Sequence, residues 1–108
     1  MVDEGQFVRM ADKTIADLFD RLEEEIGETA EVDLHEGVLT VALDGGGQYV
    51  INKNAPNRQI WLSSPVSGAA HFGYDDERGW ISTRGGERLL AILEREFSAA
   101  AGSAIVLG

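Results

Sequence analysis

The sequence contains no cysteine, only two prolines, and no apolar run approaching the roughly 18 residues of a membrane-spanning helix. Without cysteine the chain can form no disulfide, offer no thiolate to zinc or an iron–sulfur cluster, and attack no substrate through sulfur. Because it has only two histidines, any metal would be bound mainly by oxygen ligands. Disulfide-stabilised, thiol-dependent and membrane-spanning classes are therefore excluded.

Basic residues are also scarce: nine Lys and Arg stand against 19 Asp and Glu, giving a formal charge of −10 over 108 residues. Twelve of the acidic residues and only three basic ones fall in the first 36 positions, so that segment carries −9. Such a charge argues against nucleic acid and against anionic membrane as partners, and favours cations or basic protein surfaces. Its confinement to one segment predicts a role for one face.

The first residues, Met1 to Glu4, resemble neither a signal peptide nor a transit peptide. We therefore expect a cytoplasmic bacterial protein, or the mature form of a protein of the mitochondrial matrix. The chain shows no internal repeat and no linker. Its length predicts one domain over residues 1–108.

Apolar residues recur every three or four positions in two segments, which is the period of an amphipathic helix. The first helix is expected from Phe7 to Ile26, with Gly27 ending it, and the second from Glu87 to a stop at Gly102. The tail from Ser103 is apolar enough to pack back on the domain. Between the helices the period falls to two, which predicts strands over Glu31–His35, Val38–Leu43, Tyr49–Lys53, Arg58–Ser63, Phe72–Tyr74 and Trp80–Thr83.

This order of elements predicts an α+β fold: a two-layer sandwich with two helices packed on one face of an antiparallel sheet of about six strands. The other face of the sheet would be uncovered. If Ile60 and Leu62 meet the helices, alternation turns Trp61 toward solvent, near the amides of Asn52, Asn54 and Gln59. A large aromatic beside hydrogen-bonding groups is typical of partner surfaces. Alternatively, the following loop half-covers Trp61, which then only packs.

The acidic residues of the first helix form a pattern of their own. Asp17, Asp20, Glu24 and Glu28 follow at intervals of three and four, so their carboxylates would form a ladder, with Asp12 and Glu23 nearer the apolar face. Like charges at this spacing oppose helix stability, which indicates a compensating use. Carboxylates without histidine or thiolate suit hard cations bound weakly with water. The alternative is a solvated charged face.

No catalytic motif is present. The sequence lacks a recognisable serine triad, P-loop, dinucleotide fingerprint and metalloprotease helix. Gly45 to Gly47 fits a hairpin turn better than a phosphate cradle, because no helix follows it. His35 and His71 are expected at the surface, where either could extend a carboxylate site.

The stretch from Tyr49 to Gly68, YVINKNAPNRQIWLSSPVSG, resembles the signature of the frataxin family. The similarity extends over nearly the whole chain, because an acidic first helix, the strand from Gly37 to Val41, this signature, the Gly79-Trp80 strand and a closing helix occur in the family's order. Membership would imply weakly bound iron, as Fe²⁺ or Fe³⁺, and a role in iron–sulfur cluster assembly. The implied metal residues are Asp12, Asp17, Asp20, Glu23, Glu24, Glu28, Glu31 and Asp33.

The resemblance also implies the partners: a cysteine desulfurase and an iron–sulfur scaffold protein, with ferredoxin as a further candidate. The implied partner-binding residues are Asn52, Asn54, Gln59, Trp61 and His71. His71 stands where animal members often carry a basic pair, which would make that contact weaker or dependent on pH. The expected state is a monomer, with iron-dependent oligomerisation as the alternative.

Three functions follow from these expectations. The first is a non-enzymatic adaptor that regulates the desulfurase or delivers iron, with activation and inhibition both open. The second is a ferroxidase or iron-storage assembly, which is the weaker reading because a single acidic stripe does not supply a fixed pair of irons. The third is an acidic protein-binding domain without a metal role.

Overall fold

The computed structural model describes residues 3–108, and its first element is the long helix α1 (Glu4–Ile26). Asp3 begins the helix with a reciprocal capping box: the Gln6 backbone N–H donates to the Asp3 carboxylate, and the Gln6 side chain accepts from the Asp3 N–H. The apolar residues predicted for one face are buried at helical spacing from Phe7 to Ile26, except Phe19, which is partly buried. Gly27 caps the end of the helix, as expected from the sequence.

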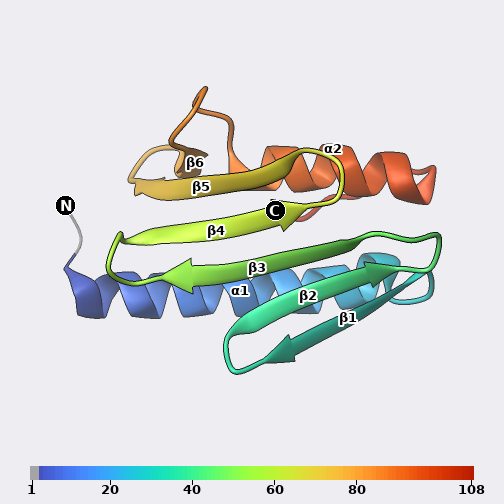
Figure 1. Cartoon of the computed structure of the whole chain (residues 1–108), viewed down its shortest axis with the longest axis horizontal. Helices are drawn as coiled ribbons and strands as arrows, with labels where there is room; N and C mark the ends of the chain where they lie inside the picture. Colours follow the sequence, from blue (N-terminus) through green and yellow to red (C-terminus); the bar gives the residue numbers. More distant parts are fainter. Residues whose placement is uncertain (1–2) are drawn as a thin grey trace.

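Six strands follow in a simple antiparallel meander, each paired with its sequence neighbour. They are β1 (Ala30–His35), β2 (Val38–Leu43), β3 (Gln48–Asn54), β4 (Gln59–Ser64), β5 (Gly68–Asp75) and β6 (Gly79–Ser82). The second helix, α2 (Leu89–Ala101), closes the fold. Both helices lie behind the sheet in Figure 1, with α1 behind the β1 side and α2 behind the β5 side. The two-layer α+β sandwich predicted from the sequence is confirmed.

One apolar core fills the space between the sheet and the helices. It joins the inner sides of the strands, the buried stripes of α1 and α2, and the tail, where Ile105 and Leu107 are buried as expected. Alternation assigns the other side chains of each strand to the outer face of the sheet. No helix among the described residues is long and apolar enough to cross a membrane.

Several boundaries differ from the sequence prediction, including the start of α1 at Glu4 rather than at Phe7, and three of the differences have a clear physical reason. β5 begins at Gly68 rather than at Phe72, because its first residues are small and carry no apolar alternation. α2 begins at Leu89 rather than at Glu87, because Glu87 accepts a backbone hydrogen bond from Ser82 and Arg88 pairs with Ile81 as extended chain. Arg58 belongs to the turn before β4, where its φ of 54° is incompatible with a strand.

A buried polar cluster ties α2 to the sheet. The Glu96 carboxylate is 6% exposed, and its Oε1 accepts hydrogen bonds from the Tyr49 hydroxyl at 2.8 Å and from the Ser64 hydroxyl at 2.6 Å. The Ser64 oxygen in turn accepts from the backbone N–H groups of Val66 and Ser67, which fixes the β4–β5 turn. Burial, together with the bond to Glu96, raises the pKa of Tyr49 to about 12. These contacts join β3, β4 and α2 at one point of the core.

Candidate functional site

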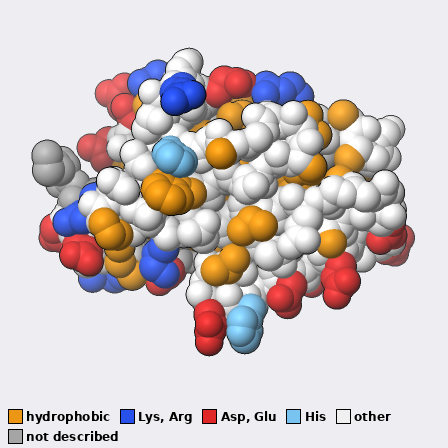
Figure 2. Space-filling model, viewed as in Figure 1, with side chains coloured by type: hydrophobic (Ala, Val, Ile, Leu, Met, Phe, Trp, Pro, Cys, Tyr) orange, Lys and Arg blue, Asp and Glu red, His pale blue; other side chains and the backbone are white. Residues whose placement is uncertain are grey.

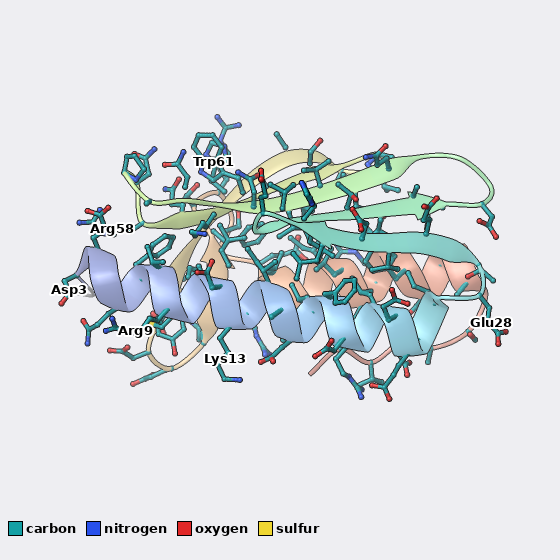
Figure 3. The ribbon with its side chains drawn as sticks, turned by 90° about the horizontal axis from the view of Figure 1, so that it is seen from below. Asp3, Arg9, Lys13, Glu28, Arg58 and Trp61 are labelled. Carbon is teal, nitrogen blue, oxygen red and sulfur yellow. The ribbon has the colours of Figure 1, made fainter. Side chains whose placement is uncertain are left out.

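Trp61 projects from the face of the sheet that the helices leave uncovered. Its neighbours Ile60 and Leu62 are buried in the core, so alternation directs Trp61 the other way. Figure 3 shows its side chain on the side of the sheet opposite α1. The prediction that Trp61 lies on the open face is therefore confirmed, although the residue is half-buried rather than fully exposed.

His71 covers part of Trp61. The two residues face each other across β4 and β5, and their rings stack with centroids 4.4 Å apart and an interplanar angle of 13°. The indole Nε1–H of Trp61 donates to Gln59 Oε1 at 2.8 Å. The alternative in which the following loop covers Trp61 is wrong, because the cover comes from the neighbouring strand. Indole, imidazole and amide thus form one preorganised patch of apolar area and polar edges.

The two asparagines of β3 extend this patch in different ways. Asn52 lies opposite Trp61 in the β3–β4 register, and its amide donates only to the adjacent Lys53 carbonyl, at 3.3 Å. Asn54 is opposite Gln59, but its Oδ1 already accepts from the backbone and side-chain nitrogens of Asn57. Asn54 therefore shapes the β3–β4 turn, and only its NH₂ group is left for a partner.

The acidic residues of α1 lie on its solvent side. Asp17, Asp20 and Glu24 repeat at intervals of three and four along the exposed surface, as predicted. Asp12 and Glu23 are eleven residues apart, about three turns, and share the flank toward β1, where Asp12 lines a cavity with Leu34. Glu28 is not part of the helical ladder, because α1 ends at Ile26 and Glu28 lies in the turn beyond it (Figure 3).

Three of the predicted metal residues already have basic partners. Asp12 accepts from Lys53 Nζ at 2.7 Å, Asp17 from Lys13 Nζ at 2.8 Å, and Glu24 lies 3.7 Å from Arg21 Nη1. Lys53 is 28% exposed against 76% for Lys13, so solvent screens its pair less. The hydrogen bond to Asp17 raises the pKa of Lys13. The other predicted metal residues make no ion pair within residues 3–108: Asp20, Glu23, Glu28, Glu31 and Asp33.

Glu31 and Asp33 lie on the edge strand β1 and point to the outer face of the sheet. They alternate with Ala30 and Val32, which are buried under α1. In Figure 2, which looks onto the outer face, acidic side chains follow its lower margin, where Figure 1 places β1. The acidic residues of α1 and those of β1 thus lie on opposite sides of the β1 backbone.

This arrangement fits a loosely held cation better than a fixed one. Within residues 3–108 no three Asp, Glu or His side chains converge closely enough to form a metal site. The donors on both sides of β1 are exposed carboxylates, which suit hard cations that keep most of their water. We refer to Asp20, Glu23, Glu24, Glu28, Glu31 and Asp33 as the acidic ridge.

Sequence reasoning missed two residues near the ridge. Lys53 and Glu36 line, together with Asp12, a cavity of about 280 Å³ between α1 and the β1–β2 turn. Alternation could have found Lys53, because it lies two residues after the buried Ile51 and so turns toward the helices. Glu36 adopts a φ of 50° in the turn, and its Oε1 lies 3.9 Å from His35 Nε2. His35 itself ends β1 and is exposed, as expected.

Comparisons with known proteins find relatives over most of the chain. The family model described as "Frataxin-like domain" matches residues 1–103. The chain is 45% identical over 98 residues to "Frataxin homolog, mitochondrial" of Schizosaccharomyces pombe, covering 86% of this chain but only 62% of that relative. It is 40% identical over 99 residues to "Iron-sulfur cluster assembly protein CyaY" of Thioalkalivibrio sulfidiphilus, covering 90% and 92%. The crystal structure of trimeric frataxin from Saccharomyces cerevisiae, complexed with ferrous iron, superposes with a TM-score of 0.76 at 40% identity over 86% of each chain.

Proposed function

Because the chain belongs to the frataxin family, we propose that it is a non-catalytic adaptor of iron–sulfur cluster assembly that binds iron weakly and docks on a cysteine desulfurase–scaffold complex. The observation that carries the proposal is the separation of two surfaces on one rigid sandwich. The acidic ridge follows α1 and the β1 edge. The second surface, which we call the Trp61 patch, consists of Asn52, Gln59, Trp61 and His71 and occupies the outer face at β3, β4 and β5. A partner and a cation can therefore be bound at the same time.

The Trp61 patch has the chemistry of a protein-binding site. Its members, Asn52, Gln59, Trp61 and His71, come from three adjacent strands and combine a large apolar area with amide and imidazole groups. Residues of this kind dominate binding energy where a partner excludes water from them. The scaffold protein and the desulfurase are the partners that the family resemblance implies for this patch.

The acidic ridge supports two roles with the same charges. Exposed carboxylates attract a basic surface of the desulfurase, and they also bind hard cations such as Fe²⁺. The carboxylates Asp20 and Glu23 on α1 and Glu31 on β1 are free of ion pairs within the described chain. Iron would be cargo or signal here, held by carboxylates and water without histidine.

A ferroxidase is less well supported than an adaptor. Oxidation at a two-iron centre needs carboxylates and histidines that converge from several elements. The ridge residues lie on either side of β1 and do not converge, and the two histidines of the chain lie on β1 and β5 at the outer face. Iron(II) consumption in air at the rate of buffer alone is the expected result.

Sulfide production tests the adaptor directly. Cysteine desulfurase and scaffold from the same organism are assayed with and without this protein, and the turnover rate is expected to change. A rise would mark an activator and a fall an inhibitor, and either supports the adaptor. An unchanged rate at saturating protein, with no complex detected, would refute it. Relatives are named from bacteria and from mitochondria, so the assay is run with the partners of the compartment in which the chain is found.

Anaerobic titration with Fe²⁺ tests the ridge. Paramagnetic broadening should be strongest for backbone amides in residues 20–33. The signal of the Trp61 indole N–H, which lies on β4 away from the ridge, should not broaden. Replacing Glu23 and Asp33 with their amides should weaken the effect, because two free carboxylates are lost. Asp76→Asn, an exposed change in the β5–β6 turn, is the matched control. Equal broadening in both variants would remove the ridge from the proposal without touching the adaptor.

A further inference from the structure

The first half of β5 has no strand beside it on one edge. β6 pairs only with Phe72 to Asp75, so Gly68 to Ala70 are paired with β4 alone. On this edge of β5, the backbone hydrogen bond nearest to the unpaired residues is the one that the Thr83 N–H donates to the His71 carbonyl, at 2.9 Å. In Figure 1, β6 lies beside the arrowhead half of β5, and no strand lies beside its starting half.

The backbone groups of Ala69 point toward this open edge. In an antiparallel ladder, alternate residues direct their N–H and C=O groups to the same side. The His71 carbonyl faces the β6 side, because it accepts from Thr83, and Ala69 is two residues earlier in the strand. Its N–H and C=O groups are therefore available to an added strand. Small residues at positions 68–70 leave room for a second backbone, and no Lys or Pro guards the edge.

A groove runs along this edge, between β5 and α2. Its volume is about 380 Å³, and it is lined by Ala70 and Ile92 and by the polar side chains of Ser82 and Thr83. Such a space accepts one or two side chains of an extended segment and is too small for a helix. The groove adjoins the Trp61 patch through His71, whose ring stacks on Trp61 and which also lines the groove.

The groove carries a net positive charge, whereas the chain as a whole is negative. Arg84 and Arg95 line it, and Glu87 is the one carboxylate among its lining residues. Glu87 is neutralised by Arg95, whose Nη1 donates to Glu87 Oε2 at 2.7 Å and lowers the pKa of Glu87. Arg84 makes no ion pair within residues 3–108. Figure 2 shows basic side chains along the upper margin of the face, on the side of β5 and β6.

We propose that the open edge of β5 binds an extended, acidic segment of a partner protein by strand addition. The partner backbone pairs with the N–H and C=O groups of Ala69, next to the Thr83–His71 contact, and a carboxylate of the segment meets Arg84. Main-chain hydrogen bonds provide the attachment, and the arginine selects the sign of the side chain. The groove does not depend on iron, nor on the adaptor role proposed above.

An NMR titration of the full chain tests this inference. The probe is a blocked pentapeptide, Thr-Val-Glu-Val-Thr, and its matched control carries Lys in place of Glu. At millimolar concentration the Glu peptide is expected to shift the amides of Ala69, His71, Thr83 and Arg84, and the Lys peptide to bind more weakly. Arg84→Gln should weaken the Glu peptide about two- to fivefold, the range of an exposed charge pair. Arg78→Gln, an exposed arginine outside the groove, should change nothing.

Ala69→Pro separates backbone pairing from charge attraction. Proline removes the N–H at the open edge, a position where sheets tolerate it, and should abolish the shifts although the spectrum still shows a folded chain. Absence of shifts with the wild-type protein would overturn the inference. Shifts at Asn52, Gln59 and Trp61 without shifts at Ala69 and Thr83 would overturn it as well, and so would equal affinity for the Glu and Lys peptides.

Discussion

Replacing Trp61 with alanine is expected to weaken binding to the desulfurase–scaffold complex by about 30-fold or more, which corresponds to roughly 2 kcal/mol or more. Trp61 is the largest side chain of the open face, and its ring is held by the stack on His71 and the bond to Gln59. A partner therefore meets a preorganised aromatic and loses little entropy in ordering it. Titration calorimetry measures the affinity, and sulfide production should return to the rate without protein.

The variant should stay folded, because the indole lies outside the core. Trp61 contacts the outer face only, and the residues that flank it in the core, Ile60 and Leu62, are unchanged. Val38→Ala is the matched control, since Val38 is a partly exposed apolar residue of the same face at β2. Affinity that falls equally in both variants would mean a general loss of structure. Full affinity in Trp61→Ala would contradict the docking surface.

Periodicity was enough to predict the layers of the fold and the direction of Trp61. The helical period of α1 and the alternation of Ile60, Trp61 and Leu62 are local properties of the sequence. They are sufficient to predict which side chains face the core. The β5 start was missed for the opposite reason. Gly68, Ala69 and Ala70 are small and show no alternation, and they are extended only because β4 supplies a ladder.

Contacts between distant residues could not be predicted from spacing. Lys53 and Asp12 are 41 positions apart, and Tyr49 and Glu96 are 47 apart, so each pair exists only when α1 or α2 lies on the sheet. The acidic ridge shows the same limit. Glu31 and Asp33 follow α1 closely in sequence, but the β1 alternation turns them to the outer face, so the strand separates them from the carboxylates of α1. The local charge pattern therefore identified the acidic residues, but it did not predict which of them lie together in the folded chain.

Glu96→Ala is expected to lower the free energy of unfolding by about 2–4 kcal/mol. The substitution leaves the buried hydroxyls of Tyr49 and Ser64 without their acceptor, and each buried unpaired group costs roughly 1–3 kcal/mol. It also leaves a cavity beside Tyr49. Urea unfolding followed by circular dichroism measures the change. Glu25→Ala, an exposed residue of α1, is the matched control and should have a small effect.

The same cluster predicts how stability falls at high pH. The pKa of Tyr49 is about 12 in the folded chain and roughly 10 when the chain is unfolded, so the unfolded state loses the proton first. The contribution of the neutral hydroxyl is fully present below about pH 10 and is lost as pH rises toward 12, up to roughly 2–3 kcal/mol. Tyr49→Phe, which keeps the ring against Phe97, should lack this part of the decline. Parallel stability curves for the wild-type protein and Tyr49→Phe between pH 10 and 12 would show that the hydroxyl ionises as readily in the core as in water.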